Sequence, residues 1–97
     1  MSYFSLEFEW HEAKARANER KHGVTFAEAC TVFADPLTLL EGDAVNPERF
    51  RILGISSSDR LLLVVYAEKN DGNTVRILSA RFATRQERRA YEEGEAW

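Results

Sequence analysis

The stretch Arg76–Tyr91, R-I-L-S-A-R-F-A-T-R-Q-E-R-R-A-Y, changes its periodicity in the middle. Its first half alternates apolar and polar residues, which predicts a strand, and its second half has the repeat of a helix. Between the halves, Thr84 and Glu87 form a T-x-x-E capping box. In such a box the hydroxyl accepts from the third helical N–H and the glutamate reaches back to the N–H of the cap. We therefore expect a strand that runs into a helix with almost no loop.

This stretch is also a local concentration of positive charge. It carries five arginines against a single acid, Glu87; the arginines are Arg76, Arg81, Arg85, Arg88 and Arg89. The whole chain has a formal net charge of -3. Local potential at a site matters more than the net value. If the protein acts on a polyanion, we expect the site to lie here.

The composition is that of one soluble globular domain. The 97 residues are 44% hydrophobic and 30% charged, which are ordinary values for a chain that buries its own core. Cys30 is the sole cysteine, so a reducing compartment fits best, and its apolar neighbours predict a small buried hydrophobe rather than a nucleophile. The first residues lack the basic segment of a signal peptide, and no apolar run approaches the roughly 20 residues that span a bilayer. The expected location is the cytoplasm.

Periodicity and turn signals predict an α+β sandwich with the order β-α-α-β-β-β-β-α. The predicted ranges are a strand at 3–10, helices at 11–22 and from 26 to about 33, strands at 37–41, 49–55 and 60–67, and the strand and helix of 76–91. Gly23 is placed to end the first helix, and Thr25 and Glu28 form a second capping box. Residues 60–67 are apolar on both faces, which predicts a central strand. The helix pair is expected to cover one face of the sheet, because both surfaces need burial.

The sequence contains no metal motif and no phosphate-binding glycine motif. The two histidines are eleven residues apart and have no partner at ligand spacing. Lys14, Asn18 and His22 share one face of the first helix, and Lys21 lies beside them. A polar stripe of this kind usually faces solvent, and His22 near a helix C-terminus is favoured as a cation for structural reasons alone. RNA cleavage without metal needs a base, an acid and cations that hold the phosphate charge. Spacing does not select that reaction over simple anion binding.

The last predicted hairpin places further charges near one another. Glu68 ends one strand and Arg76 begins the next, so the simplest interpretation of both is a cross-strand ion pair worth about 0.2–1 kcal/mol. Arg81 is expected to share a face with Ile77 and Ser79, where it needs a carboxylate or a phosphate as partner. Arg85 lies in the first turn of a helix, which suits an anionic ligand. Arg88 and Arg89 are most simply a solvated face.

Two sequence blocks resemble the BrnT family, the toxins of a type II toxin–antitoxin system. The first is K-x-x-x-N-x-x-K-H-G at 14–23, and the second is R-I-L-S-A-R-x-A-T-x-x-E-R-x-x-Y at 76–91. With Glu48-Arg49-Phe50, Gly54, Arg60-Leu61-Leu62 and Glu68, the resemblance runs from about Phe4 to Glu93. It implies a RelE-like α+β fold, with two N-terminal helices packed on an antiparallel sheet and a C-terminal helix. It also implies a metal-independent ribonuclease without a cofactor that arrests translation, and a cognate BrnA-like antitoxin that forms a 2:2 heterotetramer and binds operator DNA.

The resemblance also implies site residues, at the family's polar motif positions Lys14, Asn18, Lys21, His22, Glu68, Arg76, Ser79, Arg81 and Tyr91. On this basis we expect Arg76 and Arg81 to hold the scissile phosphate and Lys14, His22 and Glu68 to transfer protons. The expected RNA-binding residues are Asn18, Lys21, Arg85, Arg89 and Tyr91.

The chain departs from the family at two positions. His11 replaces the usual aspartate at an N-cap and should weaken the start of the first helix. The position of Tyr66 varies in the family, so no general catalytic role is expected of it.

Two other functions fit the same residues. A toxin fold whose activity has decayed would serve only as antitoxin partner or corepressor. Alternatively, residues 76–89 would bind duplex DNA directly. The acidic net charge and the lack of a helix-turn-helix pattern weigh against that alternative.

Overall fold

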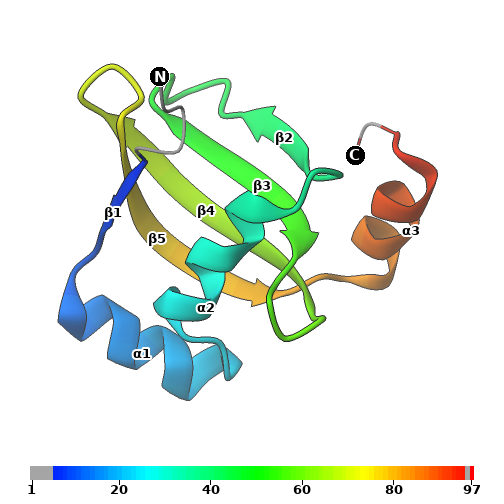
Figure 1. Ribbon diagram of the computed structural model, residues 1–97, viewed down its shortest axis with the longest axis horizontal. Helices are drawn as coiled ribbons and strands as arrows, with labels where there is room; N and C mark the ends of the chain where they lie inside the picture. The colour runs from blue at the N-terminus through cyan, green and yellow to red at the C-terminus, as the bar shows by residue number, and fades with distance from the viewer. Residues whose placement is uncertain (1–5, 96) are drawn as a thin grey trace.

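The chain folds as a five-stranded sheet with helices on both faces. The computed structural model describes residues 6–95 and 97 (Figure 1). The elements are β1 (Glu7–Glu9), α1 (Glu12–His22), α2 (Phe26–Thr31), the 3-10 helix η1 (Val32–Ala34), β2 (Leu39–Gly42), β3 (Arg49–Ile55), β4 (Leu61–Lys69), β5 (Thr74–Phe82) and α3 (Arg85–Glu93). This confirms the predicted order, with η1 as an additional turn at the end of the second helix. Residues 3–5 of the predicted first strand lie outside the described residues.

The strands are arranged in the order β1-β5-β4-β3-β2. Every neighbouring pair is antiparallel except β1 and β5, which run parallel. The prediction of an entirely antiparallel sheet was therefore wrong at β1. Short turns join β2 to β3, β3 to β4 and β4 to β5 and so make those pairs antiparallel, but no turn joins β1 to β5. The helices α1, α2 and η1 instead carry the chain from β1 to β2 at the opposite edge, so no hairpin sets the direction of β1.

Strand β5 carries one extra residue where it pairs with β4, because Leu62–Lys69 of β4 is opposite Thr74–Phe82 of β5. Ser79 is opposite Val65, but Ile77 is opposite the very next residue of β4, so Leu78 is the extra residue of a bulge. An extra residue reverses which side chains face which side of a sheet. The prediction that Arg81 shares a face with Ile77 was wrong for this reason. Ile77 lies in the core under the helix pair, and Arg81 lies on the opposite face.

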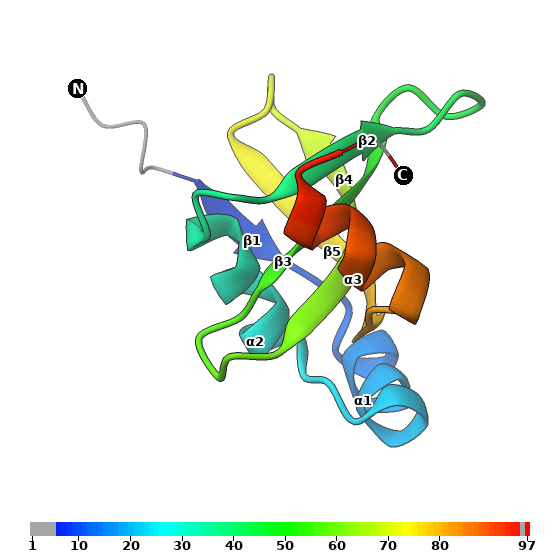
Figure 2. The same ribbon diagram turned by 90° about the vertical axis from the view of Figure 1, so that its right-hand side faces the viewer.

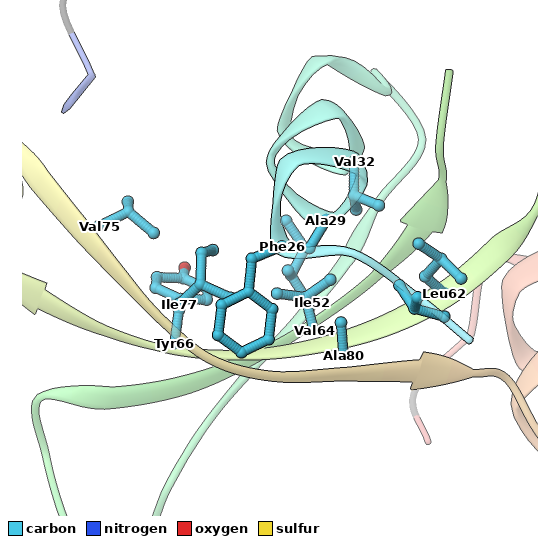
Figure 3. Packing of buried hydrophobic residues seen from close by; sticks show 11 residues of the cluster. Phe26, Ala29, Val32, Ile52, Leu62, Val64, Tyr66, Val75, Ile77 and Ala80 are labelled. Carbon is cyan, nitrogen blue, oxygen red and sulfur yellow. The ribbon is translucent and has the colours of Figure 1, made fainter. Parts of the chain in front are cut away.

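The main core lies between the sheet and the pair α1 and α2, as predicted. Figure 3 shows Phe26 of α2 directed at the strands. The buried apolar side chains of this cluster are Val24, Phe26, Ala29, Val32, Ile52, Leu62, Val64, Tyr66, Val75, Ile77 and Ala80. Trp10 packs edge-on against Phe26 with ring centroids 6.0 Å apart. Cys30 packs against the same cluster, where burial raises the pKa of its thiol to about 11, as befits a hydrophobe rather than a nucleophile.

Helix α3 covers part of the other face of the sheet. Figure 2 shows α2 and α3 on opposite sides of the strands. Under α3 a smaller cluster of Leu53, Leu61 and Leu63 is buried, with Tyr91 and Trp97 packed against it. Towards β1 and the β4–β5 turn, this face of the sheet carries half-exposed charged side chains instead of a core.

One of the two predicted capping boxes forms completely, and the other forms only in part. Thr84 and Glu87 form the complete capping box that was predicted. Thr25 accepts from the backbone N–H of Glu28, but the Glu28 carboxylate turns away to Arg60, so only half of the second box forms. The side chain of His11 makes no cap hydrogen bond, as expected where it replaces an aspartate.

Candidate functional site

Charged side chains gather on the sheet face that lies opposite α1 and α2. The register places Arg49 of β3, Ala67 of β4, Arg76 of β5 and Glu9 of β1 side by side across four strands. We name the region around this row the open sheet face; its residues are Glu9, Arg49, Arg51, Val65, Ala67, Lys69, Arg76 and Ser79. None of these eight is fully buried. The small side chain of Ala67 thus forms a floor between two arginines.

Arg76 is paired with a carboxylate, but not with the one that the sequence indicated. Its Nε donates to Oε2 of Glu9 at 2.7 Å, and Lys69 Nζ lies 3.1 Å from the same oxygen. The predicted Glu68–Arg76 ion pair was wrong, because Glu68 is opposite Val75 and so lies on the other face of the sheet. Hydrogen bonds from Arg76 and then Lys69 hold the pKa of Glu9 below its usual range, so this carboxylate is ionised at neutral pH.

Arg81 has the carboxylate partner that its position requires. Its two terminal nitrogens bind the two oxygens of Glu87 at 2.9 and 3.0 Å, and the backbone N–H of Thr84 donates to the same carboxylate at 2.9 Å. Burial raises the pKa of Glu87, but Arg81 and Thr84 outweigh it and leave the pKa below its usual range. Because of the bulge, Arg81 lies on the same face as Arg76. The two are opposite Leu63 and Ala67, four residues apart on β4, or about 13 Å along the strand.

The proton-transfer candidates are not brought to Arg76. Lys14 is exposed and His22 is partly buried, and both lie on α1. Glu68 lies next to the β4–β5 turn, at the end of the sheet away from α1 (Figures 1 and 2). Within the described residues, no side-chain hydrogen bond or ion pair joins any two of the ten candidates.

Strand β1 pairs with only the first three residues of β5, and the side chain of Asn18 hydrogen-bonds to backbone groups further along the same edge. Its Nδ2 donates to the carbonyl oxygens of Ala80 (2.8 Å) and Val24 (3.0 Å), and its Oδ1 accepts from the N–H of Ala80 at 3.1 Å. A side-chain amide offers the donor and acceptor that a neighbouring strand would have supplied. The prediction of a solvent-facing stripe was therefore wrong at Asn18, which is buried. A structural role accounts for its polar atoms.

Tyr91 ties α3 to the segment after η1. Its hydroxyl donates to Oδ2 of Asp35 at 2.6 Å, and the N–H of Ile55 donates to the same oxygen at 2.8 Å. Burial and the Asp35 carboxylate raise the pKa of Tyr91 to about 12.

The remaining RNA-binding candidates, Lys21, Arg85 and Arg89, are exposed. Arg88 is exposed as well, so Arg88 and Arg89 form the solvated face that was predicted.

The sequence interpretation missed the charges contributed by β3. Arg49 and Arg51 alternate along a predicted strand, so their common face could have been inferred from that spacing. Arg51 forms an ion pair with Glu41 and lies 4.6 Å from the ring centroid of Trp97. Beside the open sheet face there is a hollow lined by Glu41, Gly42, Asp43, Ala44, Arg49, Arg51 and Val65.

The described part of the chain has neither a metal-binding cluster nor a membrane-spanning helix. Residues 6–95 and 97 contain no cluster of three histidine, cysteine or acidic side chains that could hold a metal ion. Over the same part of the chain, no helix has the length and hydropathy needed to cross a membrane.

The fold and the open sheet face define an α+β protein with arginines on a solvent-accessible sheet, in agreement with the resemblance seen in the sequence. The family described as "Ribonuclease toxin, BrnT, of type II toxin-antitoxin system" matches residues 10–87. The chain belongs to this family. A search of curated proteins gave no match.

A solved structure supports the fold independently. The crystal structure of the Brucella abortus ribonuclease toxin BrnT is similar with a TM-score of 0.66. The sequence identity is 18%, and the alignment covers 82% of this chain and 99% of that one. At this identity the likeness shows a common fold.

Proposed function

We propose that this chain is a metal-independent endoribonuclease that arrests translation and is neutralised by a BrnA-like antitoxin. The observation that best supports it, beside family membership, is the row Arg49–Ala67–Arg76 on the open sheet face. Two arginines on either side of a small residue can hold a phosphodiester from both sides, since guanidinium groups bind phosphate oxygens in a fixed geometry. Arg81 lies on the same face further along β5 and would bind a neighbouring part of the RNA.

The remaining predicted residues have roles in this proposal. The sequence offered Lys14, His22 and Glu68 for proton transfer, but the structure brings none of them into contact with Arg76. Lys21, Arg85 and Arg89 are exposed and would contact flanking phosphates. The antitoxin would form a 2:2 complex with the toxin and bind operator DNA.

The test compares wild type with Arg76→Ala and Arg88→Ala. Each is induced in a host without the antitoxin, and total RNA is examined for cleavage; purified protein is then assayed on RNA with and without EDTA. We expect arrest and cleavage, insensitive to EDTA, from the wild type and from Arg88→Ala, and neither from Arg76→Ala. A wild type that neither stops growth nor cuts RNA would refute the proposal. Loss of cleavage in EDTA would refute metal independence alone.

One observation favours a second function, that of a binding module without activity. Both Arg76 and Arg81 already hold carboxylates of their own chain, so RNA phosphate must compete for them. A purified 2:2 complex that binds operator DNA, with free protein inert on RNA at low salt, would select this alternative.

A further inference from the structure

The carboxylate of Glu9 lies between two cations on the open sheet face. Its Oε2 is 2.7 Å from Arg76 Nε and 3.1 Å from Lys69 Nζ. The side chains of Glu9, Arg76 and Lys69 are 36%, 38% and 46% exposed. All three come from paired strands, so the backbone fixes their positions while a ligand can still reach them from solvent.

A small residue separates Arg76 of this trio from a second arginine. Across the sheet from Arg76 the next residue is Ala67, and the one beyond is Arg49. Neighbouring strands lie about 4.8 Å apart, so the two arginines start about 10 Å apart with a methyl group between them. A phosphate above Ala67 would contact Arg76 and Arg49, with the Glu9 carboxylate at its edge.

The other acids near the arginines are less suited to proton transfer. Glu68 is on the opposite face of the sheet from Arg76. Glu87 contacts Arg81, but its side chain is only 13% exposed and both of its oxygens are used, one of them in the α3 cap. Glu7 faces the same way as Glu9 but lies opposite Thr74 rather than an arginine. Glu9 is thus an accessible carboxylate in direct contact with Arg76.

We propose that Glu9, Lys69 and Arg76 form the reacting centre of the ribonuclease, an inference that rests on the proposed function. Glu9 accepts the proton of the ribose 2′-hydroxyl as the 2′ oxygen bonds to phosphorus. The bond from phosphorus to the 5′ oxygen breaks, and the Lys69 ammonium donates its proton to that oxygen. Arg76 and Arg49 hold the charge on the non-bridging oxygens. The products are a 2′,3′-cyclic phosphate and a 5′-hydroxyl. A proton passing from Glu9 to Lys69 restores both groups without a co-reactant.

Substrate binding would itself prepare Glu9 for this role. In the free protein Arg76 and Lys69 lower the pKa of Glu9, which keeps the carboxylate ionised and able to accept a proton. A phosphate bound to the same cations shares their charge, so the pKa of Glu9 rises and its basicity increases while RNA is bound. The charged groups that face Glu9 are Arg76 from β5 and Lys69 from β4, with Glu7 beside it on β1.

The experiment measures single-turnover cleavage of a short RNA by the purified chain over a range of pH. The variants are Glu9→Gln and Lys69→Gln, and Glu7→Gln is the matched control from the same face of the same strand. We expect Glu9→Gln to slow cleavage by about 100-fold or more, the usual scale of acid–base catalysis, and to remove the acidic limb of the pH profile. Lys69→Gln should also slow cleavage, and Glu7→Gln should leave the rate unchanged. Thermal unfolding of each variant checks that it is folded.

A swapped pair separates chemistry from ion pairing. Glu9→Arg combined with Arg76→Glu keeps an ion pair at this position, so the double variant should fold normally and fail to cut RNA. Cleavage by the swapped protein, or a wild-type rate and pH profile in Glu9→Gln, would overturn the inference and leave the ribonuclease proposal standing. If the wild type cuts neither free RNA nor RNA on ribosomes, the proposed function fails, and this inference fails with it.

Discussion

Replacing Asn18 by alanine should destabilise the protein strongly, although the residue lies in a stripe of surface-type polar residues. The change removes three hydrogen bonds between α1 and backbone groups. It leaves the N–H and carbonyl of Ala80 and the carbonyl of Val24 without their partner. Both of these residues are fully buried.

The expected size follows from those three groups. An unsatisfied buried polar group costs about 1–3 kcal/mol. Water can enter the space beside the sheet edge, so we take about 1 kcal/mol for each group and about 3 kcal/mol in total. A domain of this length has about 5–15 kcal/mol of stability. The corresponding fall in Tm is about 12–24 °C. Asn18→Asp should cost at least as much, because a carboxylate cannot donate to either carbonyl.

The assay is equilibrium unfolding in urea, followed by tryptophan fluorescence, to which Trp10 contributes from its place against Phe26. Asn73→Ala is the control: Asn73 is exposed in the β4–β5 turn, and the change should stay within about 0.5 kcal/mol. A loss of less than about 1 kcal/mol for Asn18→Ala would contradict the argument. Loss of RNA affinity at unchanged stability would instead support the RNA-binding role predicted from the sequence.

Three further changes test other contacts by urea unfolding. Glu28→Gln should cost about 1–2 kcal/mol near pH 7. Arg60 holds the pKa of Glu28 below its usual 4.5, so the stabilisation is present above that value and is lost as pH falls through the lowered pKa. A cost that does not diminish as the pH is lowered through the acid range would contradict this. Gly54→Ala should cost about 1–3 kcal/mol, because the new Cβ would lie 2.7 Å from Thr38 Cγ2. Gly42→Ala, with its nearest neighbour at 3.9 Å, should cost far less, and equal effects would refute the packing argument. Tyr91→Phe should cost about 1 kcal/mol and remove one tyrosine that ionises near a pKa of 12 in an absorbance titration. The raised pKa means that this stabilisation holds below pH 10 and fades above it; an unchanged titration curve would exclude the Asp35 contact.

Local signals in the sequence predicted most of the elements. The turn Asn70–Asn73 places Asn70, Asp71 and Gly72 at positive φ, the conformation that these residue types favour. Gly23 ends α1 in the left-handed region, and β3 has the predicted bounds. Such features depend on a few adjacent residues, and for that reason one sequence was enough to find them.

Features that depend on the alignment of distant strands were not predicted. The ion pair of Arg76 with Glu9 requires the parallel pairing of β1 with β5, between residues 67 positions apart. The diversion of Glu28 to Arg60 requires the β3–β4 turn to lie beside α2. Opposite charges are abundant in the chain, so composition allowed several partners for each arginine. The strand register determines which carboxylate lies next to each arginine, and no single segment of the sequence encodes that register.

The bulge at Leu78 shifts the alternation of side chains along the rest of β5. Each residue of β5 after the bulge points to the opposite face of the sheet from the one it would have without the bulge. Arg81 lies on the same face as Arg76 because of this shift. Leu78 therefore contributes to the site as an extra backbone residue in the strand rather than through its side chain. A deletion at position 78 would restore plain alternation along β5 and turn Arg81 towards the helix pair.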